Sequence, residues 1–148
     1  MTDTLLPSHR SWNMSRIRNK NTKPELRVRS TLHKAGYRFR LHRKDLAGTP
    51  DIVLPKYRIV IFVHGCFWHR HKNCKYAYTP KSRTAFWEEK FRENVIRDQM
   101  KILSLQQAGW RVLVVWECET FDLQTLSNHL KTLLSPYEPE TSLPMKML

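Results

Sequence analysis

The chain has 148 residues, of which 41% are hydrophobic and 11% aromatic, and this composition is typical of one globular domain rather than a disordered chain. Its net charge of +13, from 26 Lys and Arg against 13 Asp and Glu, favours a polyanionic partner over an acidic or neutral one. The sequence contains no long apolar run and no N-terminal secretory signal, which predicts a cytoplasmic protein without a membrane span. The odd count of three cysteines predicts reduced thiols.

Local patterns predict a folded domain over residues 12–134, between a loose leader (1–11) and a Pro-containing, disordered tail (135–148). Thr22, Pro24 and Glu25 are typical of a helix start, with Glu25 placed to complete a capping box, and Gly36 is typical of a helix end. Polar and apolar residues then alternate over 37–41, which predicts a half-buried strand.

Further strands are predicted over residues 51–54, 58–63 and 110–116. Residues 64–83 form a polar and aromatic loop, and a long helix is expected over 85–108. The leucines at 123, 126, 130 and 133 predict a final helix that docks on the domain. The order of elements favours an α/β fold with a mixed sheet flanked by helices.

A zinc-binding pattern lies in the loop after residue 63. Cys66, His71 and Cys74 are spaced C-x4-H-x2-C, and Cys118 follows the last strand. Four such ligands would enclose a tetrahedral ion with no open position, which predicts structural zinc rather than catalytic zinc. The alternative is that the cysteines are buried apolar thiols and that His71 is solvated.

A second candidate site combines Asp51 with His64 and His69. Asp51 follows Gly-Thr-Pro and resembles the Pro-Asp element of the PD-(D/E)XK nucleases, but the second carboxylate and the lysine of that pattern are missing from the next strand. A Mg2+ ion would then be held by Asp51, by the backbone carbonyl of Val63 and by water. A histidine would take over the acid–base role of the lysine. Asp51 as a simple turn residue is the alternative.

Large aromatic side chains accompany these ligands. Phe67 and Trp68 lie between Cys66 and His69, and Trp87 lies in the first turn of the long helix. Apolar rings on a loop suit insertion between base pairs, which costs less at a mismatch than in a perfect duplex. Alternatively, Trp87 covers the core while the other two rings shield the zinc.

Taken together, these motifs resemble the very-short-patch-repair DNA mismatch endonucleases. The resemblance covers about residues 12–118 and is carried by segments 13–17, 22–25, 48–53, 62–69, 87–90, 94–98, 109–112 and 115–118. It implies a restriction-endonuclease-like fold and a Mg2+-dependent nick on the 5′ side of the thymine in a T:G mismatch, the product of 5-methylcytosine deamination. Asp51 would bind the metal, His69 would activate water, and His64 and Glu25 would assist.

The resemblance also assigns the remaining positions. It implies a structural zinc held by Cys66, His71, Cys74 and Cys118, and a wedge formed by Phe67, Trp68 and Trp87. It implies further DNA contacts from Lys90, Asn94, Met14 and Ile17. This chain departs from the family pattern where Arg70 and Lys72 interrupt a run of histidines and where Asn73 precedes Cys74.

The expected partner is double-stranded DNA with a T:G mismatch, and the expected state is a monomer. Residues 1–44 carry 12 basic and 2 acidic side chains, so the basic surface belongs mainly to the front of the chain, although a solvated basic face is the simpler reading. The sequence does not decide whether a mismatch-repair accessory protein assists. Two rival functions remain: a sequence-specific restriction-type endonuclease and a non-catalytic zinc DNA-binding module.

Overall fold

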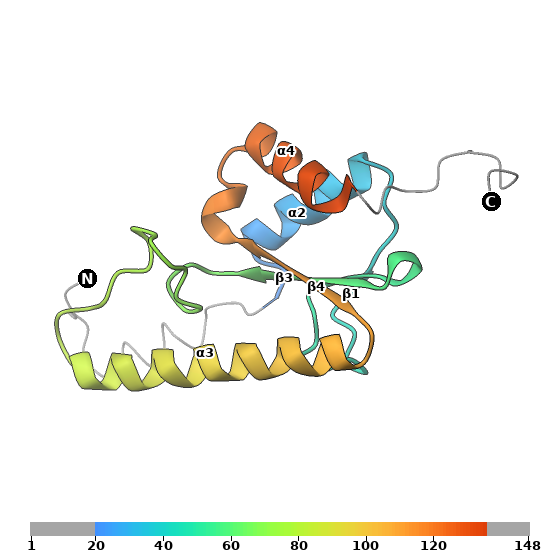
Figure 1. Cartoon of the computed structure of the whole chain (residues 1–148). Coiled ribbons are helices and arrows are strands. Elements are labelled where there is room, and N and C mark those ends of the chain that lie inside the picture. Colours follow the sequence, from blue (N-terminus) through green and yellow to red (C-terminus); the bar gives the residue numbers. More distant parts are fainter. Residues whose placement is uncertain (1–19, 136–148) are drawn as a thin grey trace, which may run out of the picture.

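The computed structural model describes residues 20–135, which form a four-stranded sheet between two layers of helices (Figure 1). In chain order the elements are α2 (Lys23–Lys34), β1 (Arg40–Leu41), β2 (Ile52–Leu54), η1 (Pro55–Tyr57), β3 (Ile59–His64), α3 (Thr84–Gln107), β4 (Arg111–Trp116), η2 (Glu117–Thr120) and α4 (Leu123–Leu134). The predicted leader and tail, apart from Ser135, lie outside the described residues.

Strand pairing brings the two predicted sites to one end of the sheet. The order is β1-β2-β3-β4, and β2 pairs antiparallel with β3, so Asp51 at the start of β2 lies beside the end of β3. β3 and β4 are parallel and pair His64 with Trp116, so the segments that follow both strands also leave the sheet together. Topology therefore gathers residues that are up to 67 positions apart in the sequence, from Asp51 to Cys118.

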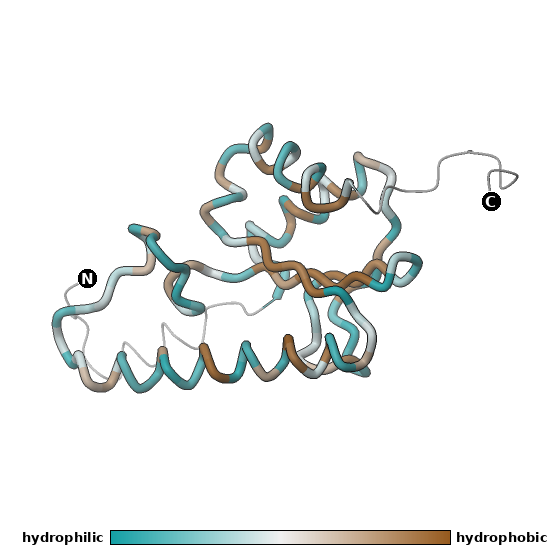
Figure 2. The backbone as a smooth tube through the Cα atoms, in the orientation of Figure 1, coloured by the Kyte–Doolittle hydropathy of each residue, from teal (hydrophilic) through white to brown (hydrophobic). Residues whose placement is uncertain are grey.

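The core has two parts, one on each face of the sheet. Alternate side chains such as Ile59 and Ile61 of β3 pack against α2 and α4, while Val60 and Phe62 face the side covered by α3. In Figure 2 the most hydrophobic stretches run along the strands, and most of α3 is hydrophilic. The predicted mixed sheet with helices on both faces is confirmed.

Two of the predicted elements differ in detail from the structure. The strand expected over residues 37–41 is reduced to Arg40–Leu41, because Tyr37 donates its backbone N–H to the carbonyl of Leu32 at the end of α2. In α4 the buried stripe is Leu126, Leu130 and Leu134, so Leu123 is exposed rather than docked. No helix within residues 20–135 combines the length and the apolar character that crossing a bilayer requires.

Candidate active site and metal sites

A pocket of about 430 Å3 opens at the end of the sheet where β2 begins and β3 ends. Its lining includes carboxylates, imidazoles and lysines from five separate segments of the chain. These residues are Lys20, His42, Lys44, Gly48, Thr49, Asp51, Phe62, Val63, His64, His69, Asp98 and Lys101. Three of the residues expected to do chemistry, Asp51, His64 and His69, therefore share one cavity.

Asp51 is fixed by the neighbouring strand. Its Oδ2 accepts a hydrogen bond of 2.8 Å from the backbone N–H of Val63. Burial raises the pKa of the Asp51 carboxyl to about 6, with a further upward contribution from the charge of Glu25. A buried carboxylate next to another carboxylate is a site that a cation would stabilise, because the positive charge offsets both burial and repulsion.

Glu25 and His42 complete a first cluster with Asp51. One ligand atom from each residue lies within 4.8 Å of the other two. Glu25 is 1% exposed, and its carboxylate accepts hydrogen bonds from the guanidinium of Arg29 and from the backbone N–H of Asn21 at 3.1 Å. Its Oε2 also lies 2.8 Å from Nε2 of His42. Glu25 is therefore placed beside Asp51 as a fully hydrogen-bonded buried charge.

The capping box predicted at the start of α2 forms only in part: the Thr22 cap is present, but Glu25 has a different partner. Thr22 caps the helix by accepting from the backbone N–H of Glu25 at 3.3 Å, as expected. The carboxylate of Glu25 accepts from Asn21 rather than from the backbone N–H of Thr22. This shift directs the other carboxylate oxygen toward His42 and the pocket.

His64, His69 and Asp98 form a second cluster in the same pocket. The two imidazole rings are stacked with centroids 3.9 Å apart, and Nδ1 of His69 lies 2.6 Å from Oδ2 of Asp98. This hydrogen bond fixes the ring of His69 and leaves its Nε2 for a proton transfer. Burial lowers the pKa of His64 to about 4, with a smaller contribution from His69, so His64 is neutral at pH 7.

Both clusters suit a hard cation at their carboxylates, because Mg2+ prefers oxygen ligands. Asp51 is the residue that would hold it, with Glu25 in the same cluster and Asp98 in the lining of the same pocket. Val63 lines the pocket and donates its N–H to Asp51, but the predicted role of its carbonyl stays a prediction.

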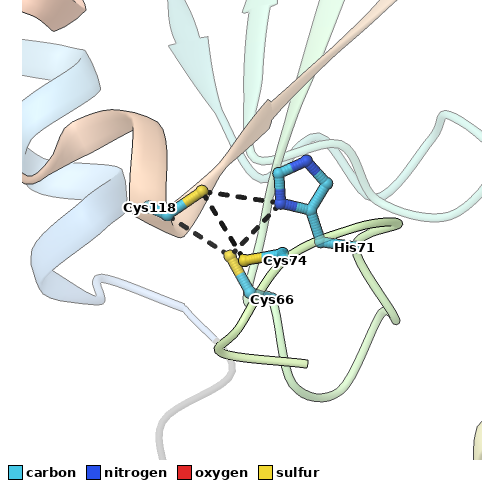
Figure 3. A group of neighbouring side chains, drawn as sticks. All are labelled: Cys66, His71, Cys74 and Cys118. Carbon is cyan, nitrogen blue, oxygen red and sulfur yellow. Dashed lines mark hydrogen bonds between the residues drawn. The ribbon is translucent and has the colours of Figure 1, made fainter. Parts of the chain in front are cut away.

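Cys66, His71, Cys74 and Cys118 converge as the spacing predicted (Figure 3). His71 Nδ1 lies 3.7 Å from Cys66 Sγ and 3.5 Å from Cys118 Sγ, and the Sγ atoms of Cys74 and Cys118 are 4.0 Å apart. A tetrahedral zinc site with metal–ligand bonds of about 2.0 to 2.3 Å has ligand–ligand edges of about 3.5 to 3.8 Å. The four donors fit a zinc ion without rearrangement of the chain.

Contacts around the four ligands hold them in place. The ring of His71 stacks on Trp116 with centroids 4.3 Å apart, and Glu117 accepts the backbone N–H of Cys66 at 3.3 Å. The backbone N–H of Cys118 donates to Cys66 Sγ at 3.4 Å, a bond that favours a thiolate. Burial raises the pKa of the Cys66 thiol to about 12, and a bound cation would reverse that shift.

The three predicted wedge residues lie in one aromatic cluster. Phe67 has its ring centroid 5.2 Å from Trp68, 5.7 Å from Trp87 and 5.2 Å from Phe91. Phe67 and Trp68 are half-buried, whereas Trp87 is 2% exposed. Because Trp87 is enclosed by these rings, Phe67 and Trp68 are the members of the cluster that can reach a duplex without repacking α3.

Of the remaining predicted DNA contacts, Asn94 donates its side-chain N–H to the backbone carbonyl of Trp68 at 3.3 Å, which ties the aromatic loop to α3. Lys90 is exposed one turn earlier on the same helix. Met14 and Ile17 lie outside the described residues.

Comparison with known proteins identifies the family. The family model described as DNA mismatch endonuclease Vsr matches residues 2–76. A Type II nicking enzyme, V.XorIIP, from Xanthomonas oryzae pv. oryzae is 55% identical over 136 residues, which is 92% of this chain and 99% of the relative. The chain belongs to the DNA mismatch endonuclease Vsr family.

Other relatives agree with this membership. The DNA mismatch endonuclease Vsr of Escherichia coli is 44% identical over 132 residues, covering 89% of this chain and 84% of that protein. Among solved structures, the catalytic domain of the homing endonuclease I-Bth0305I matches with a TM-score of 0.54 at 21% identity, over 78% of this chain and 97% of that domain. The similarity to the Escherichia coli protein supports the identification of a DNA endonuclease. The similarity to the homing endonuclease domain supports the fold alone.

Two residues of the pocket of this Vsr-family protein, His42 and Asp98, had no predicted role. Asp98 lies one turn after Asn94 on α3, and this spacing in a segment already matched to the family was the available signal. His42 follows an exposed strand and has a left-handed backbone with φ of 48°, so nothing in the local pattern distinguishes it from a solvated histidine.

Arg70, where the chain departs from the usual histidine run, fastens the aromatic loop. Its guanidinium donates to the carbonyls of Phe67, Ala77 and Tyr78 at 2.9 to 3.1 Å and to the hydroxyl of Thr79 at 3.0 Å. It also lies 3.8 Å from the centroid of Phe91.

We expect Arg70→Ala to lower the free energy of unfolding by about 2 kcal/mol, because several hydrogen bonds and a cation–π contact are lost together. Arg70→Lys should recover less than half of this, since lysine lacks the planar fork that reaches four acceptors. Urea unfolding of the zinc-loaded protein measures both values. Arg92→Ala, which removes an exposed ion pair with Glu89, is the matched control and should cost no more than about 0.5 kcal/mol. Equal losses for Arg70→Ala and Arg92→Ala would contradict the fastening role.

Proposed function

We propose that this Vsr-family endonuclease nicks one strand of a DNA duplex on the 5′ side of the thymine in a T:G mismatch, with Mg2+ as its catalytic ion. One observation carries the proposal. The pocket that holds Asp51, His64, His69 and Asp98 adjoins the aromatic loop, because His69 directly follows Trp68. A base step opened by Phe67 and Trp68 would therefore leave its backbone phosphate next to the pocket.

The residues divide the chemical work as follows. Asp51, the backbone carbonyl of Val63 and water would hold Mg2+, and Glu25 would assist through metal-bound water. When bound, Mg2+ neutralises charge on the phosphodiester and makes phosphorus more electrophilic. His69, oriented by its hydrogen bond to Asp98, takes the proton of the attacking water at Nε2. The His69–Asp98 pair takes over the acid–base role of the lysine that the PD-(D/E)XK pattern would place on β3. His64, stacked on His69 and neutral, limits the movement of its ring.

Zinc is the second proposed ion, and its role is structural. Cys66, His71 and Cys74 come from the loop that carries Phe67, Trp68 and His69, and Cys118 comes from η2 beyond β4. A zinc ion held by all four would tie this loop to the sheet. The distance between the wedge and the catalytic residues would then stay constant when DNA binds.

Strand-labelled duplexes test the proposal directly. Duplexes with T:G, T:A or C:G at one position, in a pool of randomised flanking sequences, are incubated in chelating-resin-treated buffer with and without added Mg2+. We expect nicking of the thymine strand of T:G only, and at least ~100-fold slower turnover without Mg2+. Mg2+ is omitted rather than chelated so that zinc is retained.

The same assay separates the rival functions. Several relatives are named Type II nicking enzymes, and a restriction-type activity would cut T:A or C:G duplexes in a defined sequence. Cleavage of matched duplexes as fast as T:G would overturn mismatch specificity. Undiminished turnover without Mg2+ would overturn the proposed metal.

A further inference from the structure

The helix α3 contributes a lysine to the catalytic pocket, whereas β3 contributes none. Lys101 lines this pocket together with Asp51, His64, His69 and Asp98. It lies three residues after Asp98 on α3, so both side chains occupy the same face of the helix. The helix thus delivers a carboxylate and an ammonium to the same site.

The stem of Lys101 is held by Gly48. A Cβ atom built on Gly48 would lie 2.7 Å from both Cγ and Cδ of Lys101, closer than carbon atoms can approach. Gly48 also has a φ of +72°, which disfavours any other residue. The loop before Asp51 therefore packs directly on the lysine stem and fixes its direction, while Lys44, which lines the same pocket, is exposed.

The charge of Lys101 is available to a ligand. Within residues 20–135 no carboxylate lies within ion-pair distance of its ammonium, and Oδ2 of Asp98 is bonded to His69. Its charge still acts inside the pocket. Burial alone would raise the pKa of the Asp98 carboxyl. The hydrogen bond from His69 and the nearby charges, including that of Lys101, outweigh burial, so the pKa of Asp98 lies below its usual range. A half-buried ammonium with no acidic partner in a nuclease pocket suits a phosphate.

We propose that Lys101 is a catalytic residue that contacts a non-bridging oxygen of the scissile phosphate. The inference rests on the proposed function and adds a substrate contact to it. Attack by water places additional negative charge on the phosphoryl oxygens in the transition state. An ammonium already aimed at them lowers the barrier, because little reorganisation is needed when the charge develops. Lys101 thus supplies from a helix the charge that a strand lysine would supply in the PD-(D/E)XK pattern.

The first test compares variants of Lys101 under single-turnover conditions on the T:G duplex. Lys101→Met keeps the stem that packs on Gly48 and removes the charge, and we expect its nicking rate constant to fall by ~100-fold with thermal stability unchanged. Lys101→Arg should recover at least ~10-fold of that loss. Lys131→Met, at an exposed position of α4, is the matched control and should nick at the wild-type rate.

The second test locates the contact without measuring cleavage. Duplexes with either a normal phosphate or a neutral methylphosphonate at the nicked position are bound to Asp51→Asn protein, with and without Lys101→Met. Neutralising the phosphate should weaken binding ~5-fold when Lys101 is present and less than ~2-fold when it is methionine, which is the signature of a direct pair. Equal losses in both proteins would overturn the contact.

Failure of this inference is distinguishable from failure of the proposed function. If the wild-type protein nicks T:G duplexes and Lys101→Met nicks them equally fast, the role of Lys101 is wrong and the proposed function stands. If the wild-type protein does not nick T:G duplexes at all, the proposed function itself is wrong.

Discussion

Asp51→Asn is expected to reduce the nicking rate by on the order of 1,000-fold or more, the largest effect of any single substitution in the pocket. Asparagine keeps an oxygen that accepts from the backbone N–H of Val63, so the local structure should persist. It removes the negative charge that would hold the cation. Because the half-buried carboxylate lies near Glu25, the substitution also relieves repulsion, and thermal stability should be unchanged or higher.

Mismatch binding should survive this substitution, because the predicted wedge lies outside the pocket. Fluorescence anisotropy with a T:G duplex should give a dissociation constant within ~3-fold of wild type. Asp45→Asn is the matched control, since Asp45 is an exposed carboxylate that pairs with Arg43 in the preceding loop. Full activity of Asp51→Asn, or an equal loss in Asp45→Asn, would remove Asp51 from the mechanism.

Cys118→Ser is expected to abolish zinc binding and to destabilise the fold by several kcal/mol, since structural zinc sites contribute about 10 kcal/mol or more of binding free energy to folding. The serine hydroxyl is a poor zinc ligand. Loss of the Cys118 thiolate would detach η2 from the loop that carries Cys66 and Cys74. The zinc content measured by elemental analysis should fall from one zinc per chain toward none. The midpoint of thermal unfolding should decrease by more than ~10 °C.

A pair of histidine substitutions separates zinc binding from general damage. His71→Asn removes a proposed ligand and should also lose zinc, whereas His33→Asn, an exposed position on α2, should retain one zinc and wild-type stability. Wild-type zinc content in Cys118→Ser would exclude Cys118 from the site.

Much of the fold could be predicted because local signals and tertiary packing agree. The apolar run that became β3, the glycine after α3 and the Thr22 cap each specify an element whose bounds differ by only one or two residues from the structure. The strand around Tyr37 could not be predicted correctly. Its alternating pattern is that of a strand, but the backbone N–H of Tyr37 satisfies a helix carbonyl instead of a sheet partner.

The site was predictable where its residues lie close together in sequence. Cys66, His71 and Cys74 have ligand spacing within one loop, and the four donors converge as expected. His42, Asp98 and Lys101 join the pocket only through tertiary packing of a short edge strand and the polar helix α3. On such elements polar residues are usually solvated, so the periodicity of the sequence contains no signal for His42 or Lys101. Only its place in the family-matched segment 94–98 pointed to Asp98.

The two ligand sets share the loop after β3, and this arrangement suggests how recognition and hydrolysis would be linked. His64 and His69 face the pocket, Cys66 and His71 face the zinc cluster, and Phe67 and Trp68 lie between them. A rigid loop would move wedge and catalytic histidine together. Insertion at a mispair would then determine which phosphate enters the pocket.

Mapping the nick at nucleotide resolution tests this account most directly. A T:G duplex labelled at the 5′ end of one strand and the 3′ end of the other is treated with zinc-loaded protein and Mg2+, and products are resolved against sequencing ladders. We expect one product, from cleavage on the 5′ side of the mispaired thymine, and an intact guanine strand. Cleavage of both strands, or at a position that does not move with the mismatch, would contradict it.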